Sequence, residues 1–295
     1  MKIRFGFAVL LVLMLAFFTA GCLDEDEGTE VEGQAVEEEA SLEDDLELVD
    51  LGEDVGAEDI YARAMAALEE VNAYSYIMEI DSDIDLPGVY AQAFNVITEG
   101  KATFNPPADE MVISFTSPEM VMDLQMYVVE QIMYIDVPDL GWVWYSEGDD
   151  DGLEMDFLQE DVRDTFGIAE QIGLSRAEVE IEEGYYLVFF DSDDEAFTRV
   201  IKDLALEQAL GDSDMEDFFD SITFKNVYFG FVIDRATFLP SSLALDYLIE
   251  MEIEGETLTT KQLIEIDFME FGTFEQISVP EDVVAEAIAY QDLVQ

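Results

Sequence analysis

The segment SLALDYLIEMEI, residues 242–253, alternates between apolar and polar side chains along most of its length. Successive side chains of a β-strand point to opposite faces, so this alternation predicts a strand with one buried and one solvated face. The apolar face is formed by Leu243, Leu245, Tyr247, Ile249, Met251 and Ile253. The segment is about twice as long as a typical strand. Because Thr223–Ile233 and Glu256–Phe268 show the same pattern, we expect the C-terminal third to form a sheet of long strands.

Further strands are predicted between residues 74 and 145, where the period of two recurs. In residues 74–81, every second residue is a large apolar one: Tyr74, Tyr76, Met78 and Ile80. The other strand-like segments are Ala93–Phe104, Glu110–Ser117, Val121–Val128, Gln131–Val137 and Gly141–Tyr145. Because turns that contain Pro or Gly separate most of these segments, the pattern predicts an antiparallel meander.

Helical spacing of apolar residues predicts helices before, between and after the strands. The expected helices are Ile60–Val71, Leu153–Ile172, Glu195–Leu210 and Glu281–Leu293, and two further strands are expected at Ala177–Ile181 and Gly184–Phe190. Long strands with one apolar face and few helices predict an α+β fold. We expect a strongly curved antiparallel sheet, a half-barrel, with helices packed over its concave face. Either the helices fill the concavity or an apolar ligand shares it.

The N-terminus has the three parts of an export signal. Lys2 and Arg4 precede an apolar run, residues 5–18, which is followed by the small residues Thr19, Ala20 and Gly21. A spanning helix needs about 20 apolar residues, more than this run supplies. We therefore expect residues 1–21 to be a cleaved signal peptide, and an uncleaved anchor helix is the alternative.

Cys22 is the only cysteine of the chain, which also has no histidine. The sequence Thr19-Ala20-Gly21-Cys22 resembles the lipobox of prokaryotic lipoproteins. That resemblance implies cleavage between Gly21 and Cys22 and a diacylglycerol on the Cys22 thiol. Two acyl chains anchor a protein durably, whereas one anchors it only marginally. We therefore expect an exported lipoprotein, anchored by lipidated Cys22 to the outer face of the cytoplasmic membrane at the cell surface. A buried, unreactive cysteine is the alternative.

The charge of the chain is extreme, with 71 acidic and 11 basic residues and a formal net charge of −60. Residues 23–59 contain no Lys or Arg, so we expect an acidic disordered tether at 22–58 and one folded domain at 59–295. Such a charge repels nucleic acid, so no nucleic-acid partner is expected. Because self-repulsion destabilises a compact state unless salt screens it, the composition also predicts a halophilic, archaeal source.

The sequence gives little support for a specific metal site or for catalysis. Glu147, Asp149, Asp151 and Gly152 imitate part of an EF-hand loop, but Leu158 stands where a bidentate Glu is needed. We therefore expect no specific metal site, and loose cation association with the acidic loops stays open. Without histidine, and with the one cysteine assigned to lipid, the usual catalytic triads are not available. The chain is accordingly predicted not to be an enzyme and to need no cofactor.

Several short motifs occur in an order that resembles a known family. They are Thr98-Glu99-Gly100-Lys101-Ala102, Met133-Tyr134-Ile135-Asp136, Gly141-Trp142-Val143-Trp144, Ile233-Asp234-Arg235-Ala236-Thr237-Phe238-Leu239-Pro240 and Ile277-Ser278-Val279-Pro280-Glu281. This order resembles the DUF6612, LolA-like or LppX-like lipoproteins of bacteria and archaea, over roughly residues 59–288. The resemblance implies a half-barrel closed by helices over an apolar cavity that holds acyl chains. It implies no catalytic residue.

From alternation alone we expect nine residues to line this cavity: Tyr76, Met78, Met122, Met126, Trp142, Phe229, Phe231, Leu245 and Ile249. For Trp142, packing in the core or capping the sheet is favoured over a place at the cavity mouth. The leading functional hypothesis is a membrane-anchored lipoprotein that binds or carries a lipid, or the acyl chains of another lipoprotein. The alternative is a cell-surface interaction or scaffold lipoprotein with a filled core and no ligand. A cation-dependent enzyme is the third and weakest hypothesis.

Overall fold

The computed structural model describes most of the chain beyond residue 54. The described residues are 55–86, 90–118, 120–138, 140–146, 162–191, 199–200, 222–253 and 256–293. The expected signal peptide, Cys22 and nearly all of the expected tether lie outside these residues. So do the EF-hand-like loop and most of the helix expected at Glu195–Leu210. The fold and the candidate site are therefore those of the described residues alone.

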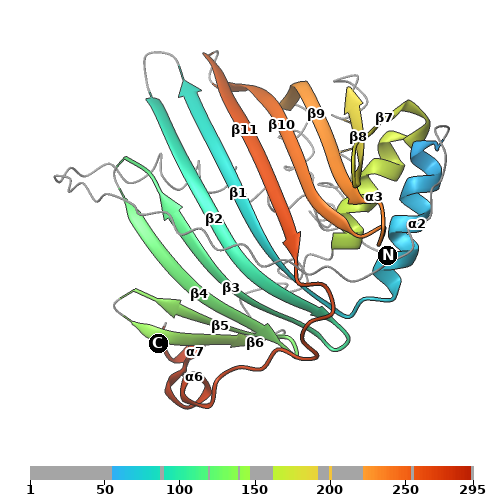
Figure 1. The fold of residues 1–295 in the computed structure, drawn as a ribbon. Helices are drawn as coiled ribbons and strands as arrows, with labels where there is room; N and C mark the ends of the chain where they lie inside the picture. The colour runs from blue at the N-terminus through green and yellow to red at the C-terminus, as the bar shows by residue number, and fades with distance from the viewer. Residues whose placement is uncertain are drawn as a thin grey trace.

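The described strands form one curved, open sheet, which is antiparallel throughout except at one edge (Figure 1). The first six strands are β1 (Ala73–Leu86), β2 (Tyr90–Phe104), β3 (Pro107–Thr116), β4 (Val121–Val129), β5 (Ile132–Val137) and β6 (Gly141–Ser146). The others are β7 (Glu178–Ile181), β8 (Tyr185–Asp191), β9 (Ile222–Asp234), β10 (Pro240–Ile253), β11 (Glu256–Met269) and β12 (Ile288–Ala289). Their spatial order is β12-β6-β5-β4-β3-β2-β1-β11-β10-β9-β8-β7. Each strand expected from alternation is present.

Two meanders make up this sheet, and one long-range strand pair joins them. Strands β1 to β6 follow one another outward on one side, and β11 back to β7 follow one another on the other side. At the junction β1 pairs with β11, with the register running from Ser75 opposite Met269 to Asp85 opposite Thr259. The alternation of both strands is therefore in phase, and their apolar residues share one face.

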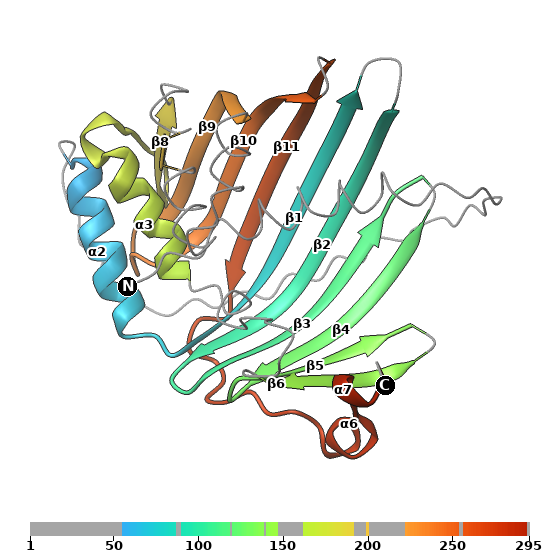
Figure 2. The same ribbon diagram turned by 180° about the vertical axis from the view of Figure 1, so that it is seen from behind.

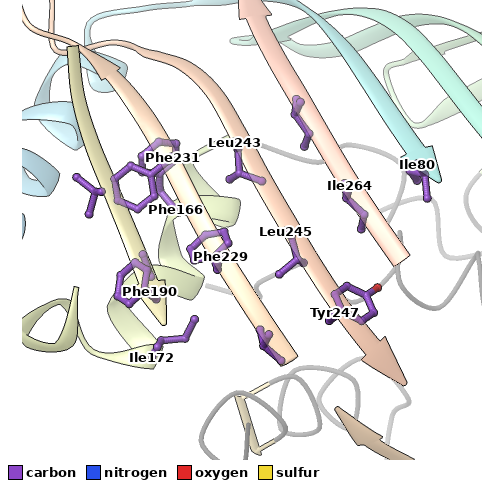
Figure 3. Close-up of a cluster of buried hydrophobic side chains, with 14 of the residues drawn as sticks. Ile80, Phe166, Ile172, Phe190, Phe229, Phe231, Leu243, Leu245, Tyr247 and Ile264 are labelled. Atoms are coloured by element: carbon purple, nitrogen blue, oxygen red, sulfur yellow. The ribbon is translucent and has the colours of Figure 1, made fainter. Parts of the chain in front are cut away.

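This shared face, here called the inner face, carries a continuous apolar row across eight strands. Opposite one another in register lie Phe190, Phe229, Leu245, Ile264, Ile80, Val96, Phe115 and Met122. Figure 3 shows five of these side chains together with residues of the adjoining row. Every one of these strands contributes a residue to the row, although the β9–β10 pairing shifts register on both sides of it, between Pro240 and Ser242 and between Asp246 and Leu248.

Helices α2 (Ala57–Glu69) and α3 (Val162–Ile172) lie at the β8–β10 end of the sheet (Figure 2). Phe166 of α3 lies 4.9 Å, ring to ring, from Phe231 of the inner face. Tyr61 of α2 donates a hydrogen bond to Glu170 Oε2 over 3.5 Å. Burial, and then the charge of Glu170 and this hydrogen bond, raise the pKa of Tyr61 to about 12. The α+β fold, with a curved sheet and helices packed against its apolar face, is thus confirmed.

The single helix expected at Glu281–Leu293 is wrong. The structure has a short helix α6 (Glu281–Glu286), the strand β12, and one helical turn α7 (Tyr290–Leu293). Ile288 and Ala289 pair in parallel with Val143 and Trp144 of β6. The tertiary pairing overrides a helical pattern that local sequence alone would favour. The expected helix at Leu153–Ile172 is described only from Val162, where α3 begins.

The outer face of the sheet is acidic along its centre. Glu79 of β1 stands directly opposite Glu265 of β11, and like charges in this position are destabilising. Exposed carboxylates extend this patch on both strands: Asp81, Asp83, Asp85 and Asp267. Salt bridges elsewhere on this face join Lys101 to Glu110, with 3.6 Å between Nζ and Oε2, and Lys225 to Glu250.

Because of this patch, we expect the thermal unfolding midpoint to rise steeply with salt. The screening length falls from about 10 Å at 0.1 M to about 3 Å at 1 M. A gain of roughly 2 kcal/mol would raise the midpoint of a domain this size by about 4–8 °C. The measurement is a melt followed by circular dichroism in 0.1 M and 2 M KCl.

The matched variant for this experiment is Glu265→Gln, which removes one partner of the facing Glu pair. It should stabilise the protein in 0.1 M KCl and have little effect in 2 M KCl. An equal effect at both concentrations, or a midpoint that does not move with KCl, contradicts the expectation.

Candidate functional site

Eight of the nine expected lining residues lie on the inner face. Met122 pairs with Phe115, Met126 with Met111, and Met78 with Ile266. The remaining five on this face are Tyr76, Phe229, Phe231, Leu245 and Ile249. Trp142 lies on the opposite face, where its ring is 5.7 Å from that of Tyr127, because Val143 takes the inward position of β6. The structure therefore brings together all of the expected set except Trp142.

Burial divides the inner face into two regions. Over β8–β11 the face is closed: Phe229 and Leu245 are 0% exposed and Phe231 is 2% exposed. Over β1–β5 the coverage is uneven: Tyr76, Met78 and Met122 are half-buried, whereas Ile80, Val96 and Phe115 are 2–6% exposed. Three half-buried inner-face residues were absent from the expected set although the same alternation marks them: Ile113, Leu124 and Ile135. We call the β1–β5 region the open region.

The open region is rich in methionine, of which Met78 and Met122 are half-buried while Met111, Met126 and Met133 are 5–7% exposed. Met111, Met126 and Met133 pack with Val128 as a cluster separate from the main core, and Ile113 and Tyr145 border it. Methionine has three rotatable bonds and a polarisable sulfur, so it adapts to ligands of irregular shape. At the border of the open region the ring of Tyr76 lies across Gly100, where an added Cβ would stand 2.3 Å from the ring. Only glycine leaves room for Tyr76 in this position.

A buried polar row crosses the boundary between the two regions. Tyr247 Oη donates a hydrogen bond to Gln262 Oε1, and Gln262 Nε2 donates to Ser82 Oγ over 2.9 Å. The three side chains belong to β10, β11 and β1 and are 1–3% exposed. Burial raises the pKa of Tyr247 far above its usual value, so the phenol stays neutral. The row satisfies three polar groups within an apolar face and holds the β10–β11–β1 register.

The structure also contains a pocket of about 560 Å³, which lies away from the expected cavity. Most of its lining residues belong to the outer face: Asp81, Asp83, Ala93, Asn95, Thr116, Lys261 and Leu263. Asn95 Nδ2 donates to Glu79 Oε1 over 2.8 Å and to Asp81 Oδ1 over 2.9 Å. Within the described residues, no group of three or more His, Cys, Asp or Glu side chains could hold a metal ion. None of the described helices is long and apolar enough to cross a membrane.

The domain is thus an open, curved and mostly antiparallel sheet, with one apolar face that is covered unevenly. Residues 56–288 match DUF6612, a family of unknown function, and the chain belongs to that family. No curated protein matches the sequence. The resemblance to the DUF6612 family that the sequence shows is thereby confirmed.

Solved structures similar to this chain include three bacterial proteins. A LolA superfamily protein from Nitrosomonas europaea is 8% identical, covers 78% of this chain and 97% of its own, and has a TM-score of 0.26. A DUF1329 family protein from Desulfovibrio piger is 11% identical, with coverages of 75% and 95% and a TM-score of 0.24. A beta-barrel-like DUF1849 protein from Brucella abortus is 9% identical, with coverages of 68% and 100% and a TM-score of 0.24. Likeness this low carries no argument about function, which has to come from the chain itself.

The polar row generates a stability prediction. Tyr247→Phe removes the donor to Gln262 Oε1 and leaves that oxygen buried, which costs about 1–3 kcal/mol of unfolding free energy. The matched control is Tyr228→Phe on β9, since Tyr228 is 46% exposed on the outer face. Its effect should stay within about 0.5 kcal/mol. Urea denaturation measures both, and equal effects of the two substitutions would contradict the structural role of the row.

Proposed function

We propose that this protein binds an acyl chain, of a lipid or of a lipoprotein in transit, against the open region of the inner face. One observation carries the proposal: the apolar row continues across eight strands, and its last member, Met122, is half-buried, whereas the seven before it are at most 6% exposed. It is completely closed at Phe229 and only half-closed at Met122. Tyr76, Met78, Ile113 and Met122 thus pack against the described core and keep part of their apolar surface exposed.

The physical argument is the cost of apolar surface in water. Each Å² removed from water is worth about 25 cal/mol, so a ligand that covers the open region gains affinity without a specific polar contact. An extended hydrocarbon chain fits this face because neighbouring rows of apolar side chains run parallel to one another across the strands. The methionines provide the adaptable walls that such a ligand needs.

The setting of this binding role is also a proposal, supported by the sequence alone. A signal peptide at 1–21, cleavage after Gly21 and a lipidated Cys22 would anchor the domain to the outer face of the cytoplasmic membrane. The acidic segment 22–58 would act as its tether. The high acidic charge fits a halophilic, archaeal source and argues against a nucleic-acid partner. The role is non-catalytic, needs no cofactor and tolerates loose cation association with acidic loops.

The alternative is a cell-surface scaffold lipoprotein whose core is filled by its own side chains. The closed β8–β11 region favours this alternative, because there the side chains already exclude water. The two functions differ in what the open region holds. A purified sample of the full chain, analysed by native mass spectrometry, separates them. We expect a non-covalent mass equal to one acyl-chain lipid, and a bare protein mass after purification without detergent favours the scaffold.

Substitution on opposite faces provides a second, quantitative test. Met122→Gln places an amide at the half-buried end of the apolar row, and burying it under a ligand costs about 1–3 kcal/mol. We expect a fatty alcohol with a fluorescent tail to bind about 5- to 150-fold more weakly. The matched control Met269→Gln alters an outer-face methionine that is 38% exposed and should leave affinity unchanged.

Fluorescence titration of the full chain measures both dissociation constants. Equal affinities for the unsubstituted chain and Met122→Gln would show that the probe does not bind in the open region.

A further inference from the structure

The outer-face pocket of about 560 Å³ carries charges of both signs. Strand β1 contributes Asp81 and Asp83 to its lining, and β11 contributes Lys261. Lys261 stands opposite Asp83 in the β1–β11 register, and side chains in such cross-strand positions have Cβ atoms about 4.5–5.5 Å apart. The volume lies within the range of small-molecule sites, roughly 300–1,000 Å³. The pocket is therefore large enough for a small molecule that contacts both strands.

Lys261 differs from the other described lysines because its ammonium group is not engaged. Lys101 and Lys225 are each paired with a glutamate on the outer face. In the part of the chain that the structure describes, the side chain of Lys261 forms no ion pair or hydrogen bond, although Asp83 lies opposite it. The three N–H donors of an ammonium group are thus available to a ligand in the pocket. In a chain with 71 acidic and 11 basic residues, a lysine without a carboxylate partner calls for an explanation.

A hydrogen-bonded bridge positions the carboxylates beside this lysine. Asn95 of β2 also lines the pocket, and its Nδ2 donates to Glu79 Oε1 over 2.8 Å and to Asp81 Oδ1 over 2.9 Å. The bridge holds two like charges close together, which a positive charge nearby would stabilise. The Asp83 carboxylate takes part in no hydrogen bond or ion pair among the described side chains. This part of the pocket can therefore accept a cationic group.

We propose that the pocket binds a small zwitterion, a molecule that carries both an ammonium and a carboxylate group. Lys261 binds the carboxylate, and Asp81 and Asp83 bind the ammonium. A simple cation would meet the charge of Lys261, and a simple anion would meet the acidic patch of the outer face, whereas a zwitterion complements both. Because the pocket lies mainly on the outer face, the site is separate from the open region and does not depend on acyl-chain binding.

Three probes of nearly the same shape test the charge requirement. Glycine betaine carries a trimethylammonium and a carboxylate group. Choline keeps the trimethylammonium and has a hydroxymethyl group in place of the carboxylate, and 3,3-dimethylbutyrate keeps the carboxylate and has carbon in place of nitrogen. Ligand-observed NMR titration of the full chain at constant ionic strength measures the three dissociation constants. We expect glycine betaine to bind about two- to fivefold more tightly than either analogue, because each analogue loses one exposed ionic contact.

Two substitutions assign the charges to their residues. Lys261→Gln should abolish the preference for glycine betaine over choline, and Asp83→Asn should reduce the preference for glycine betaine over 3,3-dimethylbutyrate. Both side chains are exposed, so neither substitution should unfold the chain. The matched controls are Lys101→Gln and Glu178→Gln, which make the same charge changes outside the pocket. They should leave both preferences unchanged.

Two results would overturn the proposal. The first is that glycine betaine binds no more tightly than choline or 3,3-dimethylbutyrate, as expected if the outer face only attracts cations or if the probe binds to apolar surface. The second is that Lys261→Gln keeps the full preference for glycine betaine over choline. The acyl-chain function has its own readout in the fluorescent fatty alcohol. Loss of alcohol binding would contradict that function and leave the preference for glycine betaine as the test of this site.

Discussion

The pairing of β1 with β11 is the constraint on which the rest of the structure depends. It joins residues near position 80 to residues near position 264 and converts two meanders into one sheet. Without it, each meander would expose its own apolar face and an unpaired edge strand. Such distant pairing carries a large loop-closure cost and is formed late or slowly in folding. The buried row Tyr247–Gln262–Ser82 crosses this junction, and its two side-chain hydrogen bonds form only in the native register.

The same pairing explains why closed and open regions occur on one continuous face. The β7–β11 meander carries α2 and α3 against its inner face, and its aromatic side chains pack against Phe166. The β1–β6 meander carries a separate cluster of flexible methionines, Met111, Met126 and Met133, and leaves Met78 and Met122 half-buried. The proposed binding surface is therefore a continuation of the core. The buried part of the inner face and the proposed ligand-binding part differ only in how far other side chains cover them.

Much of this could be predicted from the sequence because strand alternation is a local property. The inward set of β10, the meander order and the inner position of Met122 all follow from a period of two. Trp142 was misplaced since the inward phase of β6 is set by its pairing with β5. The C-terminal helix was wrong because Ile288 pairs with Val143, a contact that local spacing cannot reveal. The contacts of Arg63 with the Phe238 ring and of Arg235 with the Tyr186 ring join elements distant in sequence, and no single stretch marks them.

An unclosed sheet has two edge strands, and the unpaired backbone groups of each can pair with a strand of another molecule and cause aggregation. Here both ends are blunted by different means. The chain's own C-terminal segment lays β12 along β6, and the stacked rings of Tyr145 and Tyr290, 4.7 Å apart, hold it there. At the other end β7 is only four residues long and displays Glu178 and Glu180. The short acidic strand β7 and the pairing of β12 with β6 therefore oppose strand addition at the two edges of the open sheet.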